Sequence, residues 1–405
     1  MHWSYNYCWL WLHSDPRVIN NLNLRNKMSE RTVVVVFPSL FSLNKISSLV
    51  TSIRTVLNAK NQSFNKIRKN DSVIIVDAKD PVFASSAIAS LFGIEKIAIA
   101  TEVENSFNSV VTAIVKVGSN LILTGERFYV KVEGQSTEYL PKDVELAATS
   151  ALIEKTSDHQ IKPGTESMHD KLIYTYLTKS YAYVCIFMDK AAGGIPPKCQ
   201  DKTILCCIYD ELSAVSCLQT IKMGFDVRIL VCYRNESELL NIVKMINQIL
   251  PLLGQIKVKM NFCKLELKQS GSSNLLFKIT AITEILSLVA AKAKIDNVSI
   301  AISPLIFPAS FIEYNASRLF QRGIFPWFPL CNADNSIFES AKEIGLGKYI
   351  PKIENLCRLR FNDKNIAKGR LYGVSQKALR TLKTVTITLG PKNIHEIIDS
   401  LKSNH

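Results

Sequence analysis

The carboxyl-terminal half of the chain alternates short apolar runs with longer segments of helical periodicity. The expected strands are 203–208, 227–233, 256–262 and 298–302, and the expected helices are 213–223, 237–250, 277–291 and 334–344. Such alternation is typical of a parallel sheet with helices on both faces. The sequence therefore predicts a doubly wound α/β domain over residues 202–405, in which a ligand would lie at the carboxyl ends of the strands.

The amino-terminal part of the 405-residue chain shows a denser alternation between residues 28 and 105. Strands are expected at 33–37, 72–77 and 96–100, and helices at 45–57 and 81–92. This order suits a small α+β unit of ferredoxin-like type. Residues 1–27 are rich in Trp, Asn and His, show no periodicity and precede a second methionine, Met28. We expect them to be disordered, dispensable or upstream of the true start.

A third pattern lies between residues 106 and 190. A helix is expected at 107–117, a half-exposed strand at 128–132, a helix at 144–154 with Asp143 as its N-cap, and a hairpin of 172–177 with 181–188. Residues 191–201 contain two glycines and two adjacent prolines, which indicates a linker.

The charge of the chain favours a polyanionic partner. The formal net charge is +14, and residues 342–392 carry twelve Lys or Arg against three acidic residues. A basic segment of this kind is either a solvated face or a contact for nucleic acid. The ten cysteines include no C-x-x-C pair, so we expect no metal site and a reducing, cytoplasmic location. No uncharged apolar run reaches the length of about 18 residues that would suggest a membrane span.

Four short blocks between Phe107 and Pro196 then point to a family. Residues 125–132, 144–151, 172–187 and 193–196 resemble, in this order, the THUMP region of the tRNA 4-thiouridine synthetases, or tRNA sulfurtransferases, of the thiamine-biosynthesis type. The resemblance is closest to the archaeal members. It implies a THUMP domain at 106–190 that binds the acceptor end of tRNA by shape and backbone. Arg127, Lys131 and Lys179 are then candidate phosphate contacts, or else ordinary surface cations.

The segment after the first strand of the α/β domain departs from that family. The resemblance implies an adenine nucleotide hydrolase-like domain whose Ser-Gly-Gly-x-Asp-Ser turn cradles the phosphates of ATP, but residues 209–213 read Tyr-Asp-Glu-Leu-Ser. Without glycine, Cβ atoms block the close approach of phosphate to backbone amides. Asp210 and Glu211 also repel a polyphosphate. We expect an ordinary acidic helix start here, with a Mg²⁺ site on these acids as the less favoured alternative.

Two further family elements are incomplete, and one cysteine is notable. The family's Gly-Glu is missing after Ser303, and its arginine is missing before Pro329. Cys357 falls near the family's sulfur-handling cysteine, and neighbouring Arg358 and Arg360 would lower the pKa of a thiol at that position. The C-x-x-C pair of the archaeal members and the rhodanese domain of some bacterial ones have no counterpart in this sequence.

These patterns predict a cytoplasmic tRNA-binding protein without ATP-dependent activity of its own and without a cofactor. It would present tRNA to a tRNA-modification enzyme or assist tRNA folding. The sequence is compatible with a homodimer. The predicted RNA contacts in the basic carboxyl-terminal segment are Arg358, Arg360, Lys364, Lys368, Arg370 and Lys377. The alternative is an active tRNA sulfurtransferase that uses ATP and Mg²⁺ and transfers sulfur through Cys357. A structural interaction module without RNA explains least.

Overall fold

The computed structural model describes residues 31–157, 160–266, 272–304, 306–330, 335–358, 368–390 and 392–402. The expectations for residues 1–27 lie outside these ranges. The described chain forms two compact units. One holds residues 100–186, and the other holds residues 33–99 together with the chain from Phe187 onward. The division falls inside strands β4 (Ile94–Glu104) and β8 (Tyr181–Gly193), which therefore contribute to both units.

The first elements form the predicted ferredoxin-like unit. They are β1 (Arg31–Pro38), η2 (Leu40–Lys45), α3 (Ile46–Ala59), β2 (Phe64–Asn70), β3 (Val73–Ala78), α4 (Pro81–Ala89) and β4. The strand order β2-β3-β1-β4 is that of a βαββαβ unit. Strand β2 was not predicted, because its charged residues Lys66, Arg68 and Lys69 hide the apolar alternation. The core packs Val34, Val36 and their neighbours against α3 and α4.

The middle region has the predicted helix–strand–helix–strand–strand order. Its elements are α5 (Phe107–Leu121), β5 (Arg127–Gly134), α6 (Pro141–Lys155), the short β6 (Lys162–Pro163), β7 (Lys171–Leu177) and β8. Strand β5 runs parallel to β7, and β7 and β8 form the expected antiparallel hairpin. These strands continue the sheet of the ferredoxin-like unit in the order β4-β8-β7-β5-β6. Phe128, Val130 and Val132 face a core shared with α5 and α6.

Two local predictions in this region were wrong. Helix α6 begins at Pro141, so Asp143 is its third residue and not its N-cap. Proline is favoured at the first helical position, where its fixed φ suits the helix and its missing N–H would find no partner. The Asp143 carboxylate accepts a hydrogen bond from the Leu140 backbone N–H at 3.3 Å. Strand β8 also extends to Gly193, into the predicted linker.

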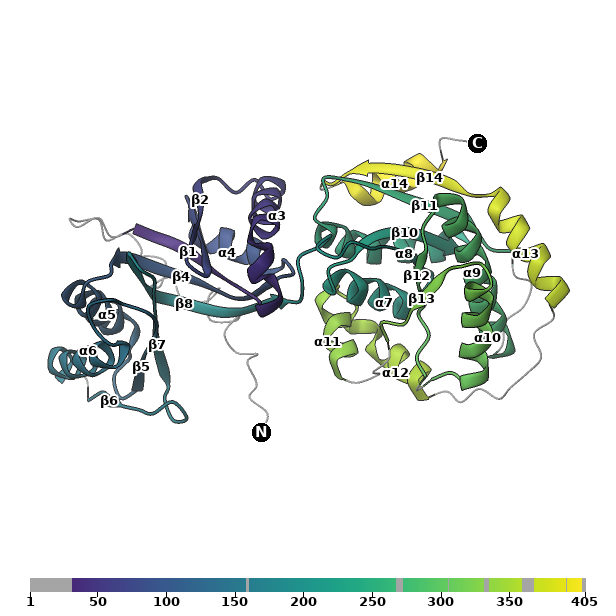
Figure 1. Ribbon diagram of the computed structural model, residues 1–405. Coiled ribbons are helices and arrows are strands. Elements are labelled where there is room, and N and C mark those ends of the chain that lie inside the picture. The colour runs from purple at the N-terminus through teal and green to yellow at the C-terminus, as the bar shows by residue number, and fades with distance from the viewer. Residues whose placement is uncertain are drawn as a thin grey trace. The chain divides into compact units, whose positions relative to one another are not determined.

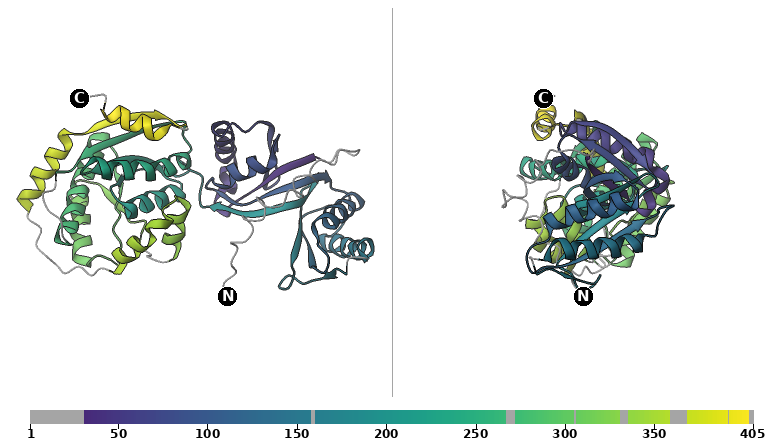
Figure 2. Two further views of the ribbon diagram at one scale, coloured as in Figure 1. Left: turned by 180° about the vertical axis from the view of Figure 1, so that it is seen from behind. Right: turned by 90° about the vertical axis from the view of Figure 1, so that its left-hand side faces the viewer.

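The carboxyl-terminal domain is the predicted doubly wound α/β fold (Figures 1 and 2). Its strands are β9 (Thr203–Ile208), β10 (Asp226–Tyr233), β11 (Lys257–Lys264), β12 (Asn297–Ser299), β13 (Phe325–Trp327) and β14 (Lys383–Thr388). The sheet order is β13-β12-β9-β10-β11-β14. The paired strands from β13 to β11 are parallel, whereas β14 pairs antiparallel with β11 at the edge. That edge strand was not predicted.

Helices cover both faces of this sheet. The helices of the domain are α7 (Glu211–Lys222), α8 (Glu236–Ile249), η4 (Leu250–Leu253), α9 (Ser272–Ala293), α10 (Ala309–Phe320), α11 (Asn335–Glu343), η5 (Gly347–Tyr349), α12 (Ile350–Arg358), α13 (Lys368–Arg380) and α14 (Asn393–Lys402). Helix α7 lies on the face of Cys206, whose thiol is hydrogen-bonded to that of Cys217. Helix α9 lies on the opposite face, where Ile279 and Ile282 approach Cys207. None of the described helices is both long and apolar enough to cross a membrane.

The described cysteines confirm the expectation that most are core residues. Six of the seven whose side chains are described are buried, and none of the seven is in a disulfide. Cys207, Cys232 and Cys263 lie on three adjacent strands, with Sγ–Sγ distances of 3.4 Å and 3.2 Å. Burial raises the pKa of Cys207, and a hydrogen bond with a neighbouring thiol together with burial raises the pKa of Cys232 and Cys263, so all three are protonated and unreactive near neutral pH. In the described ranges no group of three His, Cys, Asp or Glu is placed to hold a metal ion.

Candidate functional site

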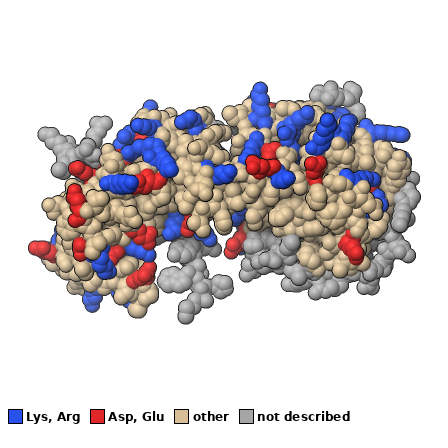
Figure 3. Space-filling model, in the orientation of Figure 1, with Lys and Arg blue, Asp and Glu red and all other residues tan. Residues whose placement is uncertain are grey.

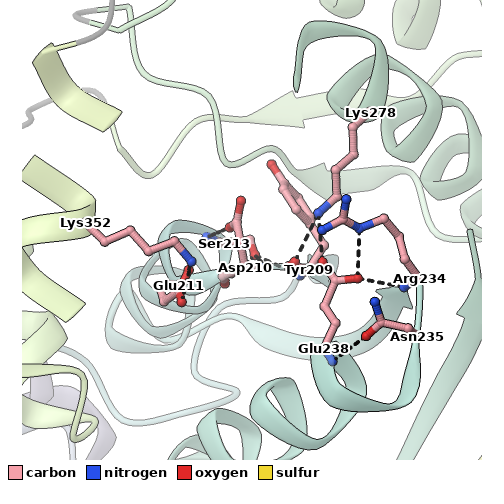
Figure 4. Close-up of polar contacts among 9 residues, drawn as sticks. All are labelled: Tyr209, Asp210, Glu211, Ser213, Arg234, Asn235, Glu238, Lys278 and Lys352. Carbon is pink, nitrogen blue, oxygen red and sulfur yellow. Dashed lines mark hydrogen bonds and ion pairs between the residues drawn. The ribbon is translucent and has the colours of Figure 1, made fainter. Parts of the chain in front are cut away.

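The turn from β9 into α7 lies where the α/β fold would place a ligand, and the chain's own side chains fill its hydrogen bonds (Figure 4). Asp210 is the N-cap of α7, and its carboxylate accepts the Ser213 backbone N–H at 2.8 Å. The Ser213 hydroxyl accepts the backbone N–H groups of Tyr209 and Asp210, at 2.8 Å and 2.9 Å. Three amides of the turn are therefore already satisfied, as expected for an ordinary capped helix start.

The charge at this turn also opposes an anion. The Asp210 side chain is half-buried, and removal of water raises the pKa of its carboxyl, although Lys278 and the hydrogen bonds from Ser213 act in the other direction. Whenever that carboxyl is ionised, it stands at the helix terminus where an external phosphate would otherwise be stabilised. The predicted helix start with acidic residues is therefore confirmed: Asp210 is the N-cap of α7 and Glu211 lies in its first turn.

A second acid at the same turn, Glu211, forms an ion pair with a lysine of α12. The Lys352 Nζ lies 2.7 Å from both carboxylate oxygens of Glu211, whose side chain is only 10% exposed. This ion pair joins the first turn of α7 to α12 across 141 residues of sequence. The sequence could not have revealed it, because nothing local marks Lys352 among the many lysines of the basic segment.

Lys278 of α9 approaches the turn from the opposite face of the sheet. Its Nζ lies 3.2 Å from Glu238 Oε1 and 3.5 Å from the Tyr209 carbonyl oxygen, and 5.3 Å from the centre of the Tyr209 ring. Arg234 donates to Glu238 through its backbone N–H and its Nε. Burial alone would raise the pKa of Glu238, but Lys278 and Arg234 outweigh it and hold that pKa below its usual range. The sequence analysis did not select Lys278 as a site residue. The signal available was a lysine within an otherwise apolar stretch of the predicted helix.

The described residues around the α7 turn leave two small cavities. One cavity lies between Tyr209 and α9, and a second is bounded by Asp210, Leu275 and Phe307; each has a volume of about 10 Å³. Such a volume holds roughly one water molecule. Small-molecule pockets are commonly about 300–1,000 Å³. Phe307 belongs to the turn after Ser303 where the family's Gly-Glu is missing, and its buried ring packs on Phe311.

The predicted RNA contacts of the middle region are engaged by acids. The Arg127 backbone N–H and Nε donate to Asp170 Oδ2 at 2.9 Å and 3.4 Å. The Lys131 Nζ lies 2.9 Å from Glu166 and 3.1 Å from Glu133, and the hydrogen bond to Glu166 raises the pKa of Lys131 most. Because these pairs are largely exposed, each contributes little to stability, and a phosphate can compete for the cations.

The other predicted residues are only partly accounted for. Lys179 is exposed in the turn between β7 and β8, and Lys377 is exposed on α13. Arg360 and Lys364 lie outside the described residues. For Cys357, Arg358, Lys368 and Arg370 the structure describes the helix but not the side chain. The proposed RNA and catalytic roles of all these residues stay predictions.

Comparison with known proteins places the fold. No family model matches the chain. A probable tRNA sulfurtransferase from Methanosarcina mazei is 24% identical over 194 residues, which is 47% of this chain and 46% of that protein. The chain thus spans about half the length of the curated relative that it matches.

Two solved structures share the fold. PH1313 from Pyrococcus horikoshii has a TM-score of 0.60 at 17% identity, and the match covers 78% of this chain and all of that one. A 4-thiouridine synthetase solved as an RNA complex with bound ATP has a TM-score of 0.62 at 13% identity, over 88% of this chain and all of its own. The predicted fold class is therefore confirmed.

Proposed function

We propose that the protein is a tRNA-binding relative of the tRNA sulfurtransferases that has no ATP-dependent activity of its own. The observation that carries the second half of this proposal is the closed amino terminus of α7. The Asp210 carboxylate caps the Ser213 amide, the Ser213 hydroxyl accepts the amides of Tyr209 and Asp210, and Glu211 is paired with Lys352. An ATP-binding turn requires these amides to be free and to face a cavity.

The energetic consequence is large. A phosphate that entered here would have to displace the Asp210 cap and break the Glu211–Lys352 pair. It would also have to enlarge a cavity that has a volume of only about 10 Å³. Each charge-assisted hydrogen bond lost to the phosphate is worth roughly 1.5–3 kcal/mol. Losing two or three weakens binding by about three orders of magnitude or more, so millimolar ATP would leave the site mostly empty.

The tRNA half of the proposal rests on three observations. The curated relative is named as a probable tRNA sulfurtransferase, and one protein of the same fold was solved with RNA. The chain also carries a net charge of +14, which suits a polyanion. Under this proposal the protein positions or stabilises tRNA for a separate tRNA-modification enzyme.

A second candidate is an active tRNA sulfurtransferase, and the name of the curated relative favours it. In that case ATP and Mg²⁺ would bind after a rearrangement of the α7 terminus, and Cys357 would carry the sulfur. The two candidates differ in whether the protein binds and cleaves ATP.

The deciding experiment measures tRNA binding by fluorescence anisotropy, and binding and cleavage of radiolabelled ATP with Mg²⁺, with and without tRNA. We expect tRNA to bind and no pyrophosphate to be released above background. Cys357→Ala should behave like its matched control, Cys199→Ala, at a half-exposed cysteine. Pyrophosphate release that requires tRNA, or sulfur transfer lost only in Cys357→Ala, would establish the sulfurtransferase instead. Absence of tRNA binding would remove both candidates.

A further inference from the structure

In the described part of the chain, the amino-terminal halves of β10 and β11 carry exposed side chains on one face of the carboxyl-terminal sheet. On the α9 side, α9 packs on Cys207 and Tyr209 at the carboxyl end of β9. At the carboxyl end of β11, the Lys264 backbone N–H donates to the hydroxyl of Thr381, the residue that follows α13. Toward the amino ends, burial alternates. Lys257 and Lys259 of β11 are exposed, while Val258 between them is buried.

The strand register places a set of polar side chains side by side on this open face. Lys257 lies opposite Thr388, and Lys259 opposite Thr386, on the antiparallel edge strand β14. Both threonines are exposed. On the other side of β11, the parallel pairing of Ile229 with Met260 sets Arg228 of β10 next to Lys259. The open sheet face is defined here by Arg228, Lys257, Lys259, Thr386 and Thr388.

Its positive charge is poorly neutralised. Neither Lys257 nor Lys259 has an ion-pair partner among the described residues. The Arg228 Nε lies 3.8 Å from Asp226, a carboxylate that Lys198 also approaches at 3.8 Å. The space-filling view shows Lys and Arg side chains gathered along the upper margin of this domain, over the region of β11 and β14 (Figure 3). Among the ion pairs of the described residues, Asp226 is the acid that reaches Arg228, and none reaches Lys257 or Lys259.

We propose that the open sheet face binds the backbone phosphates of RNA. Residues two apart on a strand are separated by about 7 Å, so Lys257 and Lys259 present a row of charges, and each has a threonine hydroxyl directly beside it. Cations and hydroxyls are the groups that contact phosphate and sugar oxygens. None of the five side chains is aromatic, so the face offers no surface for stacking bases and recognises the backbone rather than the sequence.

This proposal rests on tRNA being the partner, and it adds a contact surface at the end of the strands opposite the α7 turn. The chemistry selects RNA backbone over an acidic protein, because the cations lie in a regular row along one strand with a hydroxyl beside each. An acidic protein partner remains an outcome that the test can reveal.

The test compares two triple variants of the full chain. The first neutralises the open sheet face with Arg228→Gln, Lys257→Gln and Lys259→Gln. The matched control is Lys60→Gln, Lys96→Gln and Lys244→Gln, which removes three exposed charges that lie outside both this face and the basic segment 342–392. Thermal unfolding is measured for both, and tRNA affinity is measured from 50 to 300 mM salt. Ultraviolet cross-linking to bromouridine-substituted tRNA maps the peptides in contact.

We expect both variants to melt within about two degrees of the wild type, because all six side chains are exposed. In the first variant, the slope of log affinity against log salt should fall by about 2–3, since each lost phosphate contact removes roughly 0.7–0.9 of slope. Affinity at 100 mM salt should fall at least tenfold, and cross-links to the β11 peptide should disappear. The control should change the slope by less than 1.

Three outcomes would overturn the proposal. If the wild type binds tRNA and both variants lose equal slope, generic charge and not this face is responsible. Unchanged tRNA binding combined with weaker retention on heparin, or with loss of an acidic protein partner, would assign the face to another polyanion. If the wild type fails to bind tRNA at all, the proposed function fails first, and this inference fails with it.

Discussion

The two ends of the parallel sheet in the carboxyl-terminal domain differ in whether their charged side chains are paired within the chain. At the carboxyl ends of the strands, where such folds usually bind ligands, the charged groups described around the α7 turn are paired within the chain: the Asp210 carboxylate accepts the Ser213 N–H, Glu211 pairs with Lys352, and Lys278 pairs with Glu238. At the amino ends, Lys257 and Lys259 are exposed without an ion-pair partner in the described ranges. The same sheet therefore carries paired charges at one end and exposed, unpaired lysines at the other, within the described residues.

The difference also separates stability from binding. Groups at the closed end are buried and hydrogen-bonded, so substitutions there should destabilise the fold. Groups at the open end are solvated, so substitutions there should alter binding with little effect on folding. The predictions below follow this contrast from the largest expected effect to the smallest.

The largest effect is expected at Ser213. Ser213→Ala removes a hydroxyl that accepts two backbone N–H groups in the buried turn. Two donors left without a partner should lower the free energy of unfolding by about 2–3 kcal/mol. Denaturant unfolding measures the change. Ser119→Ala is the control, since that exposed hydroxyl donates only to the Lys116 carbonyl; an equal loss there would contradict the special role of the α7 turn.

A pH-dependent effect of intermediate size is expected at Glu238. Because Lys278 and Arg234 lower its pKa in the folded protein, ionised Glu238 stabilises the fold above its unfolded pKa of roughly 4.3. That contribution is lost as the pH falls through the lower, folded-state pKa. Glu238→Gln should therefore cost about 1–2 kcal/mol at pH 7, and the difference from wild type should shrink below pH 4. A difference independent of pH would show that charge is not the cause.

A smaller effect is expected for the cations of the middle region. Arg127 and Lys131 are paired with acids, unlike Lys257 and Lys259 of the open sheet face, for which the described residues provide no ion pair. If Arg127 and Lys131 contact phosphate, Glu166→Gln with Asp170→Asn should free Arg127 from its acid and leave Lys131 with Glu133 alone. Binding of tRNA should then tighten about threefold, because such exposed ion pairs are weak. The control removes two acids of the same region, Glu138→Gln with Glu154→Gln. Equal tightening by both would indicate only the change in net charge.

The smallest effect on stability is expected at the open end. Lys257→Gln with Lys259→Gln should change the free energy of unfolding by less than about 0.5 kcal/mol, because both side chains are exposed and neither has an ion-pair partner among the described residues. Denaturant unfolding beside the Ser213→Ala variant gives the comparison directly. A loss as large as that of Ser213→Ala would mean that the face stabilises the fold, and the contrast between the two ends would fail.

The sequence alone determined the local features of this protein. Alternating apolar patterns predicted β9 to β12 and α7, α8, α9 and α11 of the α/β domain within a few residues, and the absence of glycine in 209–213 predicted the capped start of α7. Helices α10, α12, α13 and α14 and strand β13 were not predicted from these patterns. These features depend on neighbours within one or two helical turns, so a linear pattern contains their cause. Strand β2 escaped because its charged side chains mask the alternation, and β14 because it follows a segment with little apolar pattern.

Only the tertiary structure decided which charges meet. Glu211 and Lys352 are 141 residues apart, and Lys131 and Glu166 are 35 apart. Each pair joins elements that the tertiary fold brings together, α12 with α7 in the first case and the loop after β6 with β5 in the second. The open sheet face likewise exists because β14 joins β11 in one register, setting a threonine beside each lysine. Side-chain charge is written in the sequence, but whether a charge is neutralised, buried or free depends on contacts that folding brings together over long separations.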